Sequence, residues 1–373
     1  MVSTANCSKT FYNMSKLFTP LKVGRMTLNQ RIAMAPMTRL RADASHVPLP
    51  AVKDYYQQRA SVPGSLLVTE ATVISPRHGG YPNVPGIYSD EQIAAWKEVT
   101  NAVHEKGSYI FLQLWALGRT ANPKFMANHG YDLVSSSDVP MKSMFSDEMH
   151  YPRPATEREI QDAVSDFATS AENAMKAGFD GVEIHGANGY LVDQFIQDVS
   201  NKRTDNWGGS IENRSRFAVD VTRAVGKAVG NDRTAIRLNP WSRYQGMRMD
   251  DPIPQFSDVA AKLTELKLAY LHVCESDAKD QGENLQWLLD AYRDASPVLV
   301  AGNYGAESAQ KAVDNEYAGH DVAVAFGRPY ISNPDLPFRV QQGIPFAPWD
   351  PATMYGQMSE GYVDYGFSKE FSQ

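Results

Sequence analysis

The sequence predicts a single-domain (β/α)8 barrel, or TIM barrel, because eight short apolar runs alternate with longer amphipathic segments along almost the whole chain. Strands that alternate with helices pair in parallel through right-handed crossovers, and eight such strands close into a barrel. A doubly wound open sheet is the alternative that the same alternation allows. The 373 residues are many for one domain, but α/β barrels reach this size, and no linker composition marks a boundary.

The predicted strands are short and rich in apolar residues, as strands buried on both faces are. In chain order they cover 32–34, 66–69, 109–113, 180–184, 235–238, 270–273, 298–301 and 322–326.

Seven helical patterns separate these strands, at 49–60, 90–106, 156–177, 211–229, 254–268, 283–295 and 306–315. Thr156 and Glu159 form a capping-box pattern at the start of the third helix, and Ser89 precedes the second. Gly107 and Gly178 follow the second and third helices, where glycine commonly ends a helix. The motif 207–214 is interpreted as structural, because it opens the helix before the fifth strand.

Two long segments interrupt the alternation. The first, 115–154, follows the third strand and is rich in Ser, Pro, Asp and Met, and the second, 277–282, follows the sixth strand. In a barrel both lie at the carboxyl ends of the strands, so we expect loops there that shape the substrate site.

Composition excludes several classes of function. The formal charge is −7, from 36 basic and 43 acidic residues, and no dense run of Lys and Arg predicts binding to nucleic acid or an anionic membrane. Cys7 and Cys274 are the only cysteines, which are too few for a disulfide framework or a metal site and favour a reducing, cytoplasmic location.

The amino terminus is expected to be a flexible tail over residues 1–15, followed by the barrel over 16–373. The tail is polar and lacks the apolar centre of a signal peptide, and no run approaches the ~20 apolar residues of a membrane helix. Met14 is an alternative start to Met1.

The fourth predicted strand runs into a glycine-punctuated turn that carries His185, Asn188 and Tyr190. Each of these residues, taken alone, is more often structural than catalytic. Together they suggest two hydrogen-bond donors to one substrate oxygen, with a phenol as a proton source beside them. A short helix is expected after the turn, over 191–199.

Other predicted strand ends also carry polar or glycine-bearing groups, and a barrel directs all of them at one cavity. This convergence, rather than any single residue, predicts a functional site. The residues are Pro36, Met37, Thr38, Ala71, Gln113, Trp115, Arg237, Gly302, Asn303, Gly327 and Arg328.

Arg237 lies within a predicted strand, so its charge needs an anionic partner at the barrel mouth. Gly302-Asn303 and Gly327-Arg328 follow the last two strands, where barrels often bind phosphate. A Gly-Arg pair could equally be a surface turn. A phosphorylated cofactor satisfies both demands.

These residues occur in motifs that resemble the old yellow enzyme family, FMN-dependent ene-reductases built on a (β/α)8 barrel. The resemblance extends from about residue 17 to about 365 and rests on APMTR (35–39), LQLW (112–115), GVEIHGANGY (181–190), WGGSIENR (207–214), FGRP (326–329) and GYVDY (361–365). Leu49-Pro50, Tyr55-Tyr56 and RASVPG (59–64) are further similar to a fungal subgroup of secondary metabolism that includes the chanoclavine-I aldehyde reductases.

The resemblance implies a role for each position. Residues 36–38 would line the flavin, with Thr38 near N5, Ala71 and Gln113 would contact its pyrimidine edge, and Arg237 would face N1 and the C2 carbonyl. The phosphate would be held by Gly302, Asn303, Gly327 and Arg328. The substrate carbonyl would bind His185 and Asn188, the proton would come from Tyr190, and Tyr355 and Trp115 would form walls of the substrate pocket.

The implied reaction is reduction of FMN by NADPH or NADH, followed by hydride transfer to the β-carbon of an α,β-unsaturated aldehyde or ketone. Tyr190 would protonate the α-carbon from the opposite face. Some relatives carry Phe at this position and isomerise an alkene without net reduction, so a redox-neutral isomerase or cyclase is the alternative, and a non-catalytic ligand-binding barrel is a remote one. The natural substrate, the nicotinamide, the bound substrate face and the choice between monomer and homodimer stay open.

Overall fold

A computed structural model describes residues 15–143, 146–275 and 283–371 of the chain. The expected tail, apart from Ser15, and the expected loop at 277–282 lie outside the described residues.

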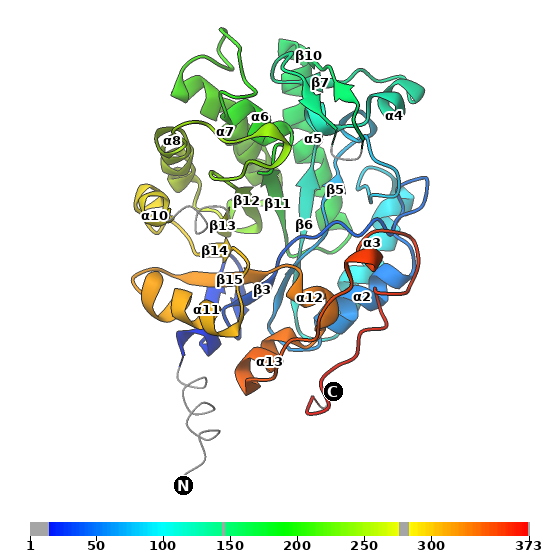
Figure 1. The fold of residues 1–373 in the computed structure, drawn as a ribbon, viewed down its shortest axis with the longest axis vertical. Coiled ribbons are helices and arrows are strands. Elements are labelled where there is room, and N and C mark those ends of the chain that lie inside the picture. The colour runs from blue at the N-terminus through cyan, green and yellow to red at the C-terminus, as the bar shows by residue number, and fades with distance from the viewer. Residues whose placement is uncertain (1–14, 144–145, 276–282, 372–373) are drawn as a thin grey trace.

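Eight parallel strands form a closed barrel, as predicted, and the open-sheet alternative is wrong. The ring closes because the last strand pairs with the first and the third pairs with the fourth. Figure 1 shows the strands at the centre of the molecule, surrounded by helices. The strands are β3 (Ile32–Met34), β4 (Leu66–Val68), β6 (Tyr109–Trp115), β11 (Gly181–Gly186), β12 (Thr234–Leu238), β13 (Tyr270–Cys274), β14 (Val298–Ala301) and β15 (Val322–Phe326).

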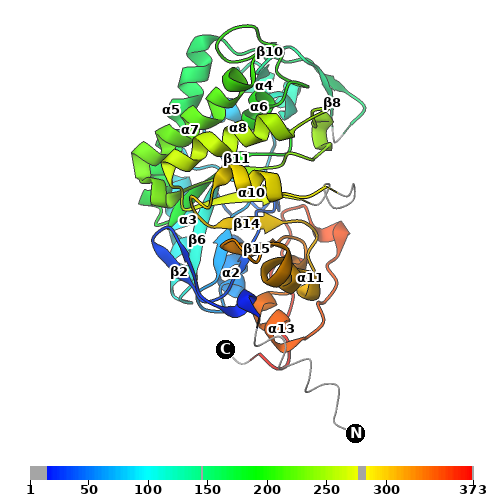
Figure 2. The same cartoon turned by 90° about the vertical axis from the view of Figure 1, so that its left-hand side faces the viewer.

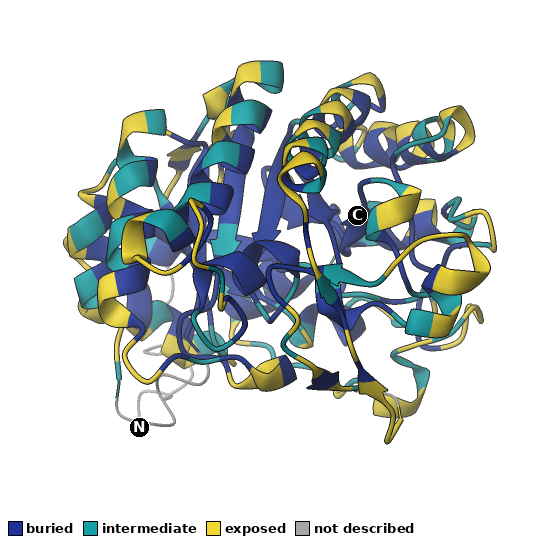
Figure 3. Cartoon of the chain, turned by 90° about the horizontal axis from the view of Figure 1, so that it is seen from above, coloured by how far each residue is buried: buried dark blue, intermediate teal, exposed yellow. Residues whose placement is uncertain are grey.

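The seven predicted helices are also present. They are α2 (Ala51–Arg59), α3 (Asp90–His104), α5 (Glu157–Lys176), α7 (Ile211–Val229), α8 (Ile253–Leu263), α10 (Gln286–Tyr292) and α11 (Ala306–Lys311). The helix at 211–229 has the predicted bounds, the next begins one residue before the predicted 254 and ends earlier, and the other five are shorter than predicted. Capping boxes at Ser89 and Thr156 satisfy the first free N–H groups of α3 and α5. Figure 2 shows the packing of α5, α7 and α8 on one flank, and Figure 3 shows buried strands inside a ring of helices with exposed outer faces.

A hairpin that the sequence did not predict packs against the amino-terminal end of the barrel. It consists of β1 (Leu21–Val23) and β2 (Met26–Leu28). Its buried side chains share a core cluster with inward-facing barrel residues such as Leu66, Phe111 and Leu299. This packing fills one end of the barrel and leaves the carboxyl ends of the strands for the site.

The long segment after β6 contains more regular structure than a loop. It includes α4 (Pro123–Asn128), a parallel pair of β7 (Val134–Ser135) with β10 (Arg153–Pro154), and an antiparallel pair of β8 (Met141–Lys142) with β9 (Met149–His150). A two-residue strand β5 (Thr72–Val73) extends the sheet beside β6. The expected helix after the fourth barrel strand is α6 (Leu191–Ile196), three residues shorter than predicted.

The motif 207–214 makes structural contacts, as interpreted from the sequence. Trp207 is buried, and its indole N–H donates to Glu157 Oε2 at 2.5 Å. Arg214 Nε donates to Gln255 Oε1 at 2.8 Å, which ties α7 to α8. Two further helices, α12 (Pro329–Ser332) and α13 (Leu336–Gln342), follow the last strand. Within the described ranges, no helix is both long enough and apolar enough to cross a bilayer.

Candidate active site

A cavity of about 1080 Å³ opens at the carboxyl ends of the barrel strands. It exceeds the ~300–1,000 Å³ of common ligand pockets, so it has room for a cofactor and a second molecule. Every residue predicted for the site lines this one cavity: Pro36, Met37, Thr38, Ala71, Gln113, Trp115, His185, Asn188, Tyr190, Arg237, Gly302, Asn303, Gly327, Arg328 and Tyr355. Their convergence is therefore a property of the fold, and their chemical roles stay predictions.

The register of the barrel places His185 directly beside Arg237, because these residues are Cα partners across β11 and β12. Beyond β11 the chain turns through Asn188 (φ 58°) and Gly189 (φ 77°). A Cβ at Gly189 would lie 2.9 Å from side-chain atoms of Gln245 and Met247, so only glycine fits this turn without displacement. The tight turn brings Asn188 and Tyr190 back to the cavity that His185 lines.

His185 is a neutral side chain in this site. It is 4% exposed, and burial, followed by the charges of Arg237 and His272, holds the pKa of its imidazole well below the ordinary value. Its Nδ1 is buried and has no hydrogen-bond partner among the described residues. A neutral imidazole with unused hydrogen-bonding capacity can donate to a ligand.

Asn188 is oriented by its neighbour Asn239. The Nδ2 group of Asn239 donates to Asn188 Oδ1 at 2.8 Å, and Gln245 Nε2 donates to the Asn188 carbonyl at 3.0 Å. Because Oδ1 already accepts, the polar group that Asn188 can offer to a ligand is its N–H₂ donor. No acceptor for this Nδ2 lies in the described part of the chain.

Tyr190 is held between two rings. Its ring lies edge-on to Trp115 at 4.9 Å between centroids and to His185 at 4.8 Å. Burial, followed by the neighbouring Tyr81 and Tyr244, raises the pKa of its phenol well above the ordinary value. The phenol is therefore protonated at neutral pH.

A buried polar network supports the part of the cavity formed by β6, β11 and β13. Glu183 accepts from Gln113 Nε2 at 2.8 Å, from the Tyr270 hydroxyl at 2.9 Å and from His272 Nδ1 at 2.8 Å. Burial opposes ionisation of Glu183, but His272, Arg237 and the Gln113 bond together hold the pKa of its carboxyl below the ordinary value. Since Gln113 donates toward Glu183, its Oε1 is the atom left to accept from a bound ligand.

Arg237 brings positive charge into the cavity. It is partly buried, and its Nε donates to Cys274 Sγ at 3.2 Å. Among the described residues no carboxylate forms an ion pair with it, so the anionic partner expected from the sequence is not supplied by that part of the protein. An anionic or carbonyl-rich ligand would balance this charge.

The remaining cofactor candidates come from two adjacent strand ends. Gly302 and Asn303 follow β14, Gly327 and Arg328 follow β15, and these strands are paired. Asn303 has φ 55°. The Arg328 guanidinium is exposed and lies 5.8 Å from the ring centroid of Trp349. Backbone groups and one cation thus meet at one edge of the cavity, a chemistry that suits phosphate.

Several cavity residues were missed from the sequence. Tyr81 and Tyr244 line the cavity from connecting segments outside the strand alternation, and no local pattern marks them. Gln245 does not line the cavity but donates to the Asn188 carbonyl. Asn239 comes two residues after Arg237, so the same strand-end rule could have found it. Glu183 could have been recognised as a charged residue inside an otherwise apolar strand.

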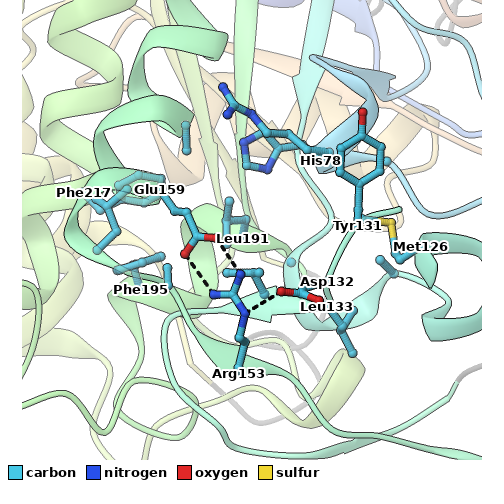
Figure 4. Close-up of a pocket in the computed structure, with 18 residues that line it drawn as sticks. His78, Met126, Tyr131, Asp132, Leu133, Arg153, Glu159, Leu191, Phe195 and Phe217 are labelled. Atoms are coloured by element: carbon cyan, nitrogen blue, oxygen red, sulfur yellow. Dashed lines mark hydrogen bonds and ion pairs between the residues drawn. The ribbon is translucent and has the colours of Figure 1, made fainter. Parts of the chain in front are cut away.

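A second, smaller cavity of about 140 Å³ lies among α5, α6, α7 and the segment after β6. Figure 4 shows its apolar side chains Leu191, Phe195 and Phe217, with Arg153 at the rim. Arg153 is paired with Asp132 at 2.9 Å and with Glu159 at 2.6 Å. None of the predicted site residues lines this cavity, and the charges at its rim are already paired.

The large cavity is suited to an enzyme that works through a bound aromatic cofactor. It combines Arg237, which forms no ion pair with a carboxylate in the described ranges, with amide groups oriented by buried partners, and it lies where barrel enzymes place their chemistry.

The chain belongs to the NADH:flavin oxidoreductase / NADH oxidase family, whose model matches residues 16–346. The resemblance to old yellow enzymes is thereby confirmed. The family uses FMN with NADPH or NADH as the reductant, so this chain is an NAD(P)H-dependent flavin oxidoreductase. Arg237, for which the described part of the chain supplies no carboxylate, and the acceptor Oε1 of Gln113 fit that cofactor.

Among similar proteins, the chanoclavine-I aldehyde reductase fgaOx3 of Penicillium roqueforti is 60% identical over 367 residues, 96% of this chain and 98% of that protein. A protein of Epichloe festucae var. lolii named as a probable inactive reductase, easA, is 51% identical over 370 residues, 96% of each chain. The crystal structure of Old Yellow Enzyme from Pichia sp. AKU4542 superposes with a TM-score of 0.89 at 37% identity, covering 96% of this chain and 95% of that one.

Proposed function

We propose that this protein reduces the activated C=C bond of an α,β-unsaturated aldehyde or ketone to a saturated product. The observation that carries the proposal is the joint placement of His185, Asn188 and Tyr190 on one wall of the cavity, with two hydrogen-bond donors beside a protonated phenol. The 60% identity to a chanoclavine-I aldehyde reductase supports an enal as the substrate.

His185 and the N–H₂ group of Asn188 bind the substrate carbonyl oxygen. As the β-carbon gains a hydride, negative charge grows on this oxygen, and the two donors, of which His185 is buried, stabilise it. The neutral state of His185 is suited to this role, because burial and Arg237 both disfavour its protonated form.

Tyr190 supplies the proton to the α-carbon. Its ring is fixed by Trp115 and His185, so the hydroxyl keeps one position relative to the carbonyl site. A positioned general acid contributes about 10²–10⁴-fold to a rate. Protonation from the face opposite the hydride yields trans addition.

Other residues that line the cavity would hold the cofactor. Residues 36–38 and Ala71 would line the flavin ring, Gln113 and Arg237 would bind its polar edge, and Gly302, Asn303, Gly327 and Arg328 would hold the phosphate. When bound, FMN supplies the two-electron chemistry between nicotinamide and alkene. Nicotinamide and substrate use the same cavity in turn.

The test is an anaerobic titration of the purified flavoprotein with NADPH and then with an enal, followed by flavin absorbance. We expect NADPH to bleach the flavin, the enal to restore its colour, and one saturated product to form per NADPH consumed. Flavin that stays oxidised with NADPH and with NADH, or that stays bleached after enals of several sizes, contradicts the proposal.

A redox-neutral isomerase or cyclase is the second candidate. It is favoured by the 51% identity to a protein named as a probable inactive reductase. In that case product forms without stoichiometric consumption of NADPH, so the same titration separates the two functions. Tyr190 favours net reduction, because isomerisation needs no proton donor at the α-carbon.

A further inference from the structure

We propose that Arg39 and Arg41 are positioning residues for substrate binding, because they hold the backbone on both sides of Tyr355 and so fix one aromatic wall of the cavity. The inference rests on the proposed function, in which Tyr355 contacts the substrate.

The two arginines bind the chain next to Tyr355 directly. Arg41 Nη1 donates to the Met354 carbonyl at 2.8 Å, and its Nη2 donates to the Thr353 carbonyl at 3.1 Å. Arg39 Nε donates to the same Met354 carbonyl at 2.9 Å. On the other side of Tyr355, the Gly356 N–H donates to the Arg39 carbonyl at 3.4 Å. The backbone is therefore held immediately before and immediately after the aromatic residue.

Tyr355 depends on this backbone support. Its side chain is 54% exposed, and no hydrogen bond of its hydroxyl occurs within the described segments. Its phenol contributes to raising the pKa of Tyr190 and the pKa of Tyr244, so the ring lies near both residues at the cavity mouth. Since the side chain has no polar anchor there, its position is set by the chain on either side of it.

Both arginines are buried, and their guanidinium groups donate to backbone carbonyls next to Tyr355. Arg39 is 0% and Arg41 is 2% exposed, and neither forms an ion pair with a carboxylate among the described residues. Their guanidinium groups lie 5.0 and 4.6 Å from the ring centroid of Tyr362. Buried cations are tolerated only when their N–H groups are satisfied, and here backbone carbonyls and an aromatic face satisfy them.

The motif 361–365, which had no role in the site, anchors the same segment. Tyr362 stacks on Tyr55 of α2 at 4.1 Å with an interplanar angle of 1°. Arg59 Nη2 donates to the Tyr362 carbonyl at 3.2 Å, and Arg39 Nη2 donates to the Gly361 carbonyl at 2.8 Å. Gly361 has φ 65°, and a Cβ there would collide with Thr353. The carboxyl-terminal segment, red in Figure 1, is thus attached to the barrel at two places, beside Tyr355 and at Gly361-Tyr362.

The same stretch of chain also lines the cofactor side of the cavity. Thr38 lines the cavity, and Arg39 is the next residue. The Arg39 N–H donates to Glu70 Oε2 at 3.1 Å, and Glu70 precedes Ala71, another lining residue. One rigid unit at the ends of β3 and β4 therefore sets the distance between the cofactor side and the Tyr355 wall.

The first test uses Arg41→Lys, which keeps the positive charge but loses the forked donors. We expect the KM for a bulky enal to rise about tenfold, the effect of losing roughly one charged hydrogen bond. The KM for an enal too small to reach Tyr355, the kcat for both and the flavin content should stay unchanged. Arg158→Lys, on the exposed face of α5, is the matched control.

Coupling to Tyr355 is tested with a double variant. If Arg41 acts through Tyr355, Tyr355→Ala raises the KM for the bulky enal by itself, and adding Arg41→Lys raises it no further. An undiminished effect of Arg41→Lys in the Tyr355→Ala background overturns the proposal. A Tyr355→Ala variant with an unchanged KM also overturns it.

A structural readout separates failure of this inference from failure of the proposed function. Hydrogen exchange followed by mass spectrometry should show faster exchange over 353–358 in Arg41→Lys than in the wild type. Unchanged exchange over this segment overturns the proposal that the arginines hold it, even if the enzyme is active. Wild-type protein that turns over no enal refutes the proposed function, and the exchange measurement still decides whether the arginines hold the segment.

Discussion

The side-chain amide of Asn239 donates to Oδ1 of Asn188 at 2.8 Å. Asn188 has the left-handed φ of 58°, so its side chain reaches the cavity from a turn that few residues adopt. The bond from Asn239 decides which end of the Asn188 amide is available to a ligand. Under the proposed function, Asn239 is therefore a positioning residue for the donor pair of His185 and Asn188.

Replacing Asn239 with alanine should release the Asn188 amide. We expect kcat/KM for an enal to fall about five- to tenfold, because a hydrogen bond of this kind is worth about 1 kcal/mol. Flavin reduction by NADPH should be unaffected. Asn239→Asp keeps the size but loses the donor, so a normal kcat/KM in that variant would refute the orientation argument.

Tyr190→Phe separates the two half-reactions. Reduction of the flavin by NADPH should proceed at the wild-type rate, whereas reoxidation by an enal should slow by about 10²–10⁴-fold, the usual contribution of a general acid. Rapid-mixing absorbance measurements follow both steps. Equal losses in the two half-reactions would show that Tyr190 shapes the cavity rather than donating the proton.

Glu183→Gln removes the charge at the centre of the buried network. We expect the free energy of unfolding to fall by roughly 2–4 kcal/mol, because Gln113, Tyr270 and His272 all donate to this carboxylate. The folded-state pKa of Glu183 is below its ordinary value of 4.5. Its contribution is thus complete above pH 4.5 and is lost as the pH falls through the folded-state pKa. Denaturant unfolding at pH 7 and at pH 4 should show a smaller difference between variant and wild type at the lower pH.

The contribution of Glu70 to the free energy of unfolding should depend on pH in the opposite sense to that of Glu183. Burial raises the pKa of its carboxyl from 4.5 to about 7. Between these values the folded state binds a proton that the unfolded state has lost, so this group favours the folded state more as the pH falls from about 7 to 4.5. Glu70→Gln keeps the neutral form at every pH. The free energy of unfolding of the variant, relative to the wild type, should therefore increase between pH 4.5 and pH 8 by about 3 kcal/mol. A difference that does not change with pH would contradict the raised pKa.

The barrel could be predicted because each of its strands carries its own signal. A parallel strand buried on both faces needs a continuous apolar run, and β15 with Val-Ala-Val-Ala-Phe is such a run. The β1–β2 hairpin and the two-residue strands after β6 carry no such periodicity, since their pairing depends on contacts made after the barrel has formed.

The candidate site followed from topology more than from single residues. His185, Gln113 and Arg237 lie on barrel strands, so their convergence was predictable once the strands were placed. Tyr81 and Tyr244 reach the cavity from loops, whose paths depend on tertiary packing. The direction in which Asn188 and Gln113 point was also beyond the sequence, because it is set by partners 51 and 70 residues away.

The hairpin at the amino-terminal end of the barrel has a kinetic consequence. Its side chains fill that end of the barrel interior, so ligands enter the cavity from the carboxyl ends of the strands. Under the proposed function, and as far as the described residues show, the product leaves by the opening through which the substrate entered, and nicotinamide and enal compete for it. Under the proposed function, excess enal should occupy that entrance before the flavin is reduced. Turnover should then fall at high enal concentration and recover when the NADPH concentration is raised.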